Sequence, residues 1–111
     1  AEAAQRILKK TNEHDVVLFE YFLTDKAGHE QNPENAFSSL DRIDKLLQEL
    51  IKEIGNNTLI ITSDHGNIEN LSVKTHTRNA VPLFAYGEKA HVFEKIESII
   101  DVKKAILKCF E

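Results

Sequence analysis

The sequence has little that would place the protein in a special class. Its single cysteine, Cys109, excludes an internal disulfide and fits a reducing compartment. No apolar run approaches the roughly 20 residues that a membrane-spanning helix needs, and the first residues lack the apolar centre of a signal peptide. We therefore expect a cytoplasmic protein that does not interact with a membrane.

Basic residues are also too few to form a positive surface. The net charge is −4 with the five histidines counted as neutral. Such a balance argues against binding to nucleic acid or to an anionic membrane. Hydrophobic residues make up 41% of the 111 residues and charged residues 29%, which is ordinary for a globular protein. A chain of this length can bury one modest core, so we expect residues 1–111 to form a single domain.

The distribution of apolar residues predicts an α/β domain. Three apolar stretches have the composition of strands: residues 16–23, 58–63 and 81–86. Between the first two, Asn32 and Pro33 mark the beginning of a long helix that ends before Gly55. A strand, helix, strand unit of this kind has parallel strands. Further helices are expected over residues 1–10 and after Asp101.

Acidic and imidazole side chains follow the predicted strands or lie in the polar loop over residues 68–80. The five candidates are Asp25, His29, Asp64, His65 and His76. Since the carboxyl ends of parallel strands meet at one sheet edge, these side chains should lie together, with Gly28 and Gly66 allowing sharp turns. Carboxylate and imidazole ligands suit Zn²⁺ or Mn²⁺ better than Ca²⁺, which prefers oxygen ligands alone. For each histidine the alternative is a helix cap or a solvated surface position.

Five ligands are too many for one tetrahedral zinc and too few for two complete sites. Two neighbouring ions would hold a phosphate between them and stabilise the attacking and leaving oxygens of a displacement. The residues alone therefore indicate a metal site at the sheet edge, and leave open whether it holds one ion or two.

Three motifs, in order along the chain, resemble the metal-binding motifs of the alkaline phosphatase superfamily. They are Asp25-x-x-Gly28-His29, Thr62-Ser63-Asp64-His65-Gly66-Asn67-x-Glu69 and His76-Thr77-Arg78-x-x-Val81-Pro82-Leu83. The second motif looks like that of cofactor-independent phosphoglycerate mutases, and the third looks as much like that of phosphopentomutases. The resemblance spans nearly the whole chain. It implies an α/β parallel-sheet sandwich with helices on both faces, of which this chain would be the C-terminal portion.

The resemblance also implies a chemistry. The superfamily uses two divalent ions, zinc or manganese, and a serine or threonine nucleophile that is transiently phosphorylated. Carried over motif by motif, Asp25, His29 and His76 would hold one ion, and Asp64 and His65 the other. The nucleophile and a further acid belong upstream of the matched segment. We therefore expect no catalytic nucleophile in this chain, which would act on a phosphorylated small molecule only with the N-terminal part of a longer phosphomutase or phosphatase.

Two other functions compete with this interpretation. The first is a non-catalytic domain that binds one ion through Asp25, His29 and His76 for a structural or regulatory purpose. The second is a thiol enzyme, which is disfavoured because Cys109 lies on the apolar face of the last predicted helix, where cysteine behaves as a small hydrophobic residue.

Overall fold

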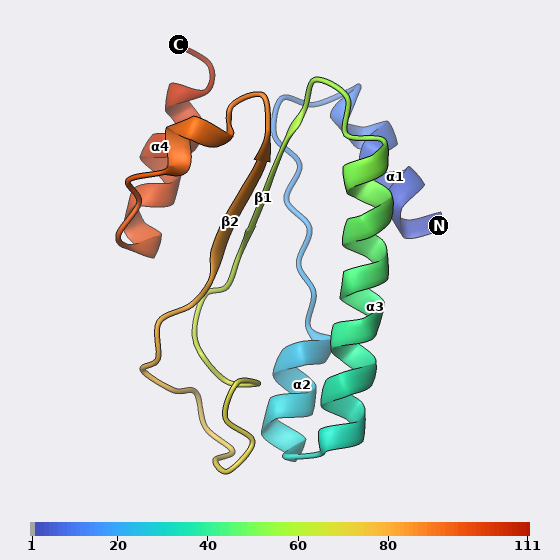
Figure 1. Ribbon diagram of the computed structural model, residues 1–111, viewed down its shortest axis with the longest axis vertical. Helices are drawn as coiled ribbons and strands as arrows, with labels where there is room; N and C mark the ends of the chain where they lie inside the picture. The colour runs from blue at the N-terminus through green and yellow to red at the C-terminus, as the bar shows by residue number, and fades with distance from the viewer. Residues whose placement is uncertain (1) are drawn as a thin grey trace.

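The computed structural model describes residues 2–111. Its elements, in chain order, are α1 (Glu2–Thr11), α2 (Leu23–Glu30), α3 (Pro33–Lys52), β1 (Thr58–Thr62), β2 (Leu83–Gly87), the 3₁₀ turns η1 (Ala90–Phe93) and η2 (Ile99–Asp101), and α4 (Val102–Lys108). In the view of Figure 1, α4 and the α2–α3 pair lie on opposite sides of the β1–β2 ribbon. The molecule is thin, with extents of 43 × 32 × 18 Å.

The long central helix α3 confirms the prediction made from its apolar spacing. Asn32 caps it, because its side chain accepts a hydrogen bond from the Asn35 amide at 3.2 Å, and Pro33 occupies the first turn. The helix is fastened to the chain before it by Tyr21, whose hydroxyl donates to the Ser39 carbonyl at 2.9 Å. Helix α2 packs against the N-terminal half of α3 (Figure 1), and the Ser39 hydroxyl of α3 donates to the Leu23 carbonyl of α2 at 3.2 Å. This packing positions the residues on α2.

The helices predicted at the two ends of the chain are also present, as α1 and α4. Ala1, which belonged to the first predicted helix, lies outside the described residues. Helix α4 buries Ala105. Cys109 caps its C-terminus as a half-buried residue, and its thiol contacts the Ala105 carbonyl at 3.4 Å.

The prediction of parallel strands was wrong. Strands β1 and β2 pair directly and antiparallel, with Leu59 opposite Tyr86 and Ile61 opposite Phe84. They follow one another along the chain without an intervening helix, so a loop suffices to join them as an antiparallel pair. The sheet of the described residues has these two strands alone, and the expected sandwich with helices on both faces of a parallel sheet is not formed by them.

The strand predicted over residues 16–23 was also wrong. Residues 16–22 form no regular element and pair with no strand within the described chain, and Leu23 already begins α2. Figure 1 shows this segment running between α3 and β1. Leu18 is 83% exposed and Phe22 is 69% exposed. Apolar composition alone does not make a strand, because the backbone groups also need a hydrogen-bonded partner strand.

The buried core is small for a chain of this length. Its apolar members in the described chain are mostly alanines: Ala4, Ala27, Ala36, Leu50, Phe93 and Ala105. Large apolar side chains instead face outward, including Phe84 and Tyr86 on alternate positions of β2. Among residues 2–111 no helix combines the length and the apolar character that crossing a bilayer requires.

Candidate metal centre

Two of the candidate ligands lie on the short helix α2. Asp25 and His29 are four residues apart, so their side chains share one face of the helix. The Asp25 Oδ1 atom lies 3.4 Å from the His29 Nε2 atom. The sequence had predicted a glycine turn at the end of a strand here, and that prediction was wrong: Gly28 is a buried residue within the helix. The helical spacing, rather than a turn, brings the acid and the imidazole together.

The third candidate, His76, comes from the loop between β1 and β2. An isolated bridge closes this loop, since the Thr77 amide donates to the Gly66 carbonyl at 2.8 Å. The carboxylate of Glu69, an exposed residue of this loop, accepts hydrogen bonds from the Thr77 hydroxyl, from the Asn79 side chain at 3.0 Å and from the Asn67 backbone amide at 2.5 Å. Hydrogen bonding, above all to the Thr77 hydroxyl, lowers the pKa of Glu69.

The loop is also tethered to α2. Its backbone carbonyls at Leu71 and Lys74 accept hydrogen bonds from Gln31 Nε2 at 3.1 Å and from His29 Nδ1 at 2.5 Å. A carbonyl can only accept, so in the neutral His29 ring, the form that binds metal, the proton is on Nδ1 and the Nε2 atom keeps its lone pair. This is the arrangement by which proteins orient a metal-binding histidine. No residue type or spacing indicates this contact in advance, because the partner of the ring is a backbone atom.

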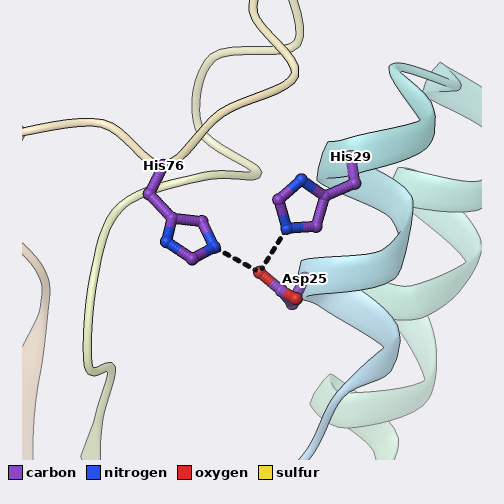
Figure 2. A group of neighbouring side chains, drawn as sticks. All are labelled: Asp25, His29 and His76. Atoms are coloured by element: carbon purple, nitrogen blue, oxygen red, sulfur yellow. Dashed lines mark ion pairs between the residues drawn. The ribbon is translucent and has the colours of Figure 1, made fainter.

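These tethers bring Asp25, His29 and His76 into one cluster, shown in Figure 2. The Asp25 Oδ1 atom lies 3.4 Å from His29 Nε2 and 3.4 Å from His76 Nε2, and one ligand atom from each residue lies within 4.8 Å of the others. Two atoms bound to one ion at about 2.1 Å in a tetrahedral site lie about 3.4 Å apart. The spacing and the donor types therefore fit a divalent ion such as zinc or manganese.

The remaining two candidates adjoin this cluster. The His65 ring stacks on the His76 ring, with centroids 3.4 Å apart and planes tilted by 17°. His65 Nε2 lies 3.4 Å from Asp64 Oδ2 and 4.0 Å from Asp25 Oδ1. The Asp64 side chain is 79% exposed. All five predicted residues thus form one continuous group, in which Asp25, His29 and His76 converge on one point and Asp64 with His65 lies beside them.

Two further residues of the site received no role from the sequence, although both lie in the second motif. Glu69 organises the loop, as described above. Asn67 is 5% exposed, and its side chain reaches α2. The signal that could have found them was their place in a motif with neighbouring ligands, since no periodicity marks either residue.

The similarity to known proteins agrees with this geometry. The profile of the metalloenzyme superfamily matches residues 1–111. The chain belongs to the metalloenzyme superfamily. The superfamily resemblance inferred from the three motifs is thereby confirmed, and the relatives below match its two phosphomutase types.

Curated relatives within the superfamily share about a third of the aligned residues. The 2,3-bisphosphoglycerate-independent phosphoglycerate mutase of Pyrobaculum islandicum is 33% identical over 86 residues, which are 78% of this chain and 20% of the relative. The phosphopentomutase of Kosmotoga olearia is 35% identical over 91 residues, covering 77% of this chain and 23% of the relative. The phosphopentomutase of Alkaliphilus metalliredigens is 30% identical over 83 residues, which cover 74% of this chain and 21% of the relative.

The chain thus spans about a fifth of the length of the curated relatives that it matches. No solved structure matches it significantly.

Proposed function

We propose that the chain is the metal-binding part of a two-metal phosphoryl-transfer enzyme, a phosphomutase or a phosphatase. The observation that carries this proposal is the convergence of Asp25, His29 and His76 on one point, in a member of a metalloenzyme superfamily with phosphomutase relatives. The substrate would be a phosphorylated small molecule, and the location cytoplasmic.

In this proposal Asp25, His29 and His76 hold one divalent ion, manganese or zinc, and Asp64 and His65 contribute to a second. Two such ions, when bound, supply positive charge that stabilises the phosphoryl oxygens during transfer. In each of two histidine rings, a backbone carbonyl beside Nδ1 orients the ring so that Nε2 could bind a metal ion. Nδ1 of His29 donates to the Lys74 carbonyl, and Nδ1 of His65 faces the Gly66 carbonyl at 3.3 Å, so Nε2 of each ring is left as the free lone pair.

We further propose that the nucleophile comes from a part of the enzyme outside this chain. Two hydroxyl groups of the metal-binding motifs already have partners in the same loop. The Ser63 hydroxyl donates to the His65 carbonyl at 2.8 Å, and the Thr77 hydroxyl donates to Glu69. Both are thus occupied in shaping the loop. In a longer parent enzyme, Asp64→Ala should abolish activity.

Titration calorimetry with Mn²⁺ and with Zn²⁺ at pH 7 tests the metal site. We expect the wild-type chain to bind, and His76→Ala to bind at least tenfold more weakly, because truncation removes one ligand of the triad. His91→Ala is the matched control, since His91 is an exposed histidine on η1 and is no part of the cluster. The absence of binding, or binding that His76→Ala leaves unchanged, would refute the proposal.

The same titration distinguishes the two-metal enzyme from the alternative function, a non-catalytic metal-binding domain. A stoichiometry of one ion that is insensitive to Asp64→Ala would favour a non-catalytic domain that holds a single ion through the triad. Binding of a second, weaker ion that Asp64→Ala removes would favour the two-metal enzyme. X-ray absorption of the zinc form should give ligand distances of about 2.0–2.2 Å in either case.

A further inference from the structure

Asn67 is a buried polar residue that joins the β1–β2 loop to helix α2. Its side-chain nitrogen Nδ2 lies 3.3 Å from Asp25 Oδ1 and 3.4 Å from His29 Nε2. Asp25 Oδ1 is the atom on which the cluster converges, and Asn67 is 5% exposed. One buried amide therefore contacts two of the three residues that would hold the ion.

The orientation of this amide is fixed by its surroundings. Both neighbours of Nδ2 are acceptors: a carboxylate oxygen of Asp25, and the Nε2 atom of His29, whose proton is on the other ring nitrogen. Turning the amide over would set its oxygen against both of them. In the observed orientation the Oδ1 atom is buried without a hydrogen-bond partner. An unpaired buried polar atom is costly, so this position needs a reason beyond packing.

Helix α2 makes room for the amide at Gly28. A Cβ atom added to Gly28 would lie 1.5 Å from Asn67 Oδ1 and 2.5 Å from Asn67 Cγ, far inside contact distance. Gly28 is an interior residue of the helix and is not among those with positive φ. Glycine is unfavourable inside a helix, and no unusual backbone angle requires it here. The absence of a side chain at Gly28 is what lets Asn67 reach the cluster.

We infer that Asn67 is a positioning residue for the metal triad and that Gly28 is required because it admits the Asn67 amide. The hydrogen bond from Asn67 holds the Asp25 carboxylate, and the Nδ1 bond to the Lys74 carbonyl holds the His29 ring. The contact between Asn67 and His29 Nε2 belongs to the ion-free site, because a bound ion would take the single lone pair of that nitrogen. A carboxylate oxygen has enough lone pairs to accept from the amide and bind an ion at once. This inference rests on the proposed function, because it assumes that the triad binds metal.

Co²⁺ titration of the full chain tests the inference, because the visible absorption of bound Co²⁺ reports the ligand geometry as well as the affinity. Asn67→Leu keeps the branched shape of the side chain and removes the donor. We expect it to weaken Co²⁺ binding about 10- to 100-fold, as loss of a partner that orients ligands does, and to change the absorption bands at saturation. Asn70→Ala is the control, since the Asn70 side chain accepts from Ser72 in the same loop and the substitution keeps the backbone bond from Asn70 to the Asn67 carbonyl, and it should match the wild type.

Gly28→Ala gives an independent test that leaves the amide in place. We expect it to weaken Co²⁺ binding as Asn67→Leu does, because the new methyl group displaces the amide. In the double variant Gly28→Ala/Asn67→Ala the methyl group meets no side-chain amide, and its remaining close neighbour is the Ile68 nitrogen at 3.2 Å. The loss should therefore be close to that of Asn67→Ala alone and well below the sum of the two single losses. If Asn67→Leu is unfolded by circular dichroism, Gly28→Ala decides, since alanine favours the helix.

The outcomes separate this inference from the proposed function. A wild-type chain that binds no Co²⁺ would overturn both. A wild-type chain that binds Co²⁺, with folded Asn67→Leu showing the same affinity and spectrum, would overturn the positioning role alone. Losses from Gly28→Ala and Asn67→Ala that simply add would show that the two residues act separately and would overturn it as well.

Discussion

Removing the carboxylate of Glu69 should destabilise the closed form of the β1–β2 loop without removing any metal ligand. Glu69 is exposed and is not one of the proposed ligands. Its carboxylate accepts hydrogen bonds from the Thr77 hydroxyl, the Asn79 side chain and the Asn67 backbone amide. In Glu69→Ala all three bonds are lost. Each contributes about 0.5–1.5 kcal/mol net, and solvent exposure reduces this, so we expect the closed loop to lose about 2 kcal/mol of stability. That free energy is a factor of roughly 30 in an equilibrium constant.

Two measurements detect this change. Hydrogen exchange of the Thr77 amide, which donates to the Gly66 carbonyl, should lose up to about 30-fold of its protection, because the amide exchanges when the loop opens. Mn²⁺ affinity should fall by a similar or smaller factor, since only the closed loop presents His76. Glu97→Gln is the control, being an exposed acid outside the site. Unchanged Thr77 protection in a folded Glu69→Ala chain would refute the reasoning.

The difference in Thr77 amide protection between the wild type and Glu69→Ala should depend on pH in a defined direction. The pKa of Glu69 in the folded chain lies below its ordinary value of 4.5, chiefly because the charged form accepts a hydrogen bond from the Thr77 hydroxyl. Its stabilising effect is therefore complete above that ordinary value and is lost as the pH falls through the lower, folded-state pKa. The difference in Thr77 protection between the wild type and Glu69→Ala should stay constant from pH 5 upward and shrink below pH 4.5.

Three further predictions concern the loop, the helix and the activity. Gly66→Ala should weaken Mn²⁺ binding at least tenfold by calorimetry, because the added Cβ would lie 2.1 Å from Thr77 Oγ1; wild-type affinity would contradict this. Asn32→Ala should lower the free energy of unfolding in urea by about 1 kcal/mol, since it removes the cap of α3, whereas Asn56→Ala, in an exposed turn, should not. The isolated chain should hydrolyse p-nitrophenyl phosphate at the background rate with or without Mn²⁺ or Zn²⁺, because no nucleophile is expected in it; metal-dependent turnover that survives repurification would show that a nucleophile is present.

The sequence predicted the local elements well where local interactions are sufficient to form them. Helix α3 has its own cap, its own proline at the first turn and its own apolar face, and it forms where those features predict. Strand β1 likewise forms where its apolar run predicted a strand. Residues 16–22 have an equally apolar run and form no strand. The difference is the partner: β1 has β2 beside it, and within the described residues nothing pairs with 16–22.

The candidate site divides in the same way between local and long-range information. The types and spacing of its five acidic and imidazole residues are properties of the sequence, and they sufficed to predict the cluster and its superfamily. The sequence could not show that Asp25 and His29 share a helix face, that a carbonyl at Lys74 orients His29, or that the Asn67 amide fits against Gly28. The last two contacts join residues about 40 positions apart, and one of them is to a backbone atom such as every residue carries, so only the tertiary structure decides them. The shared face of Asp25 and His29 depends on residues 23–30 being helical where the sequence predicted a strand end and a turn.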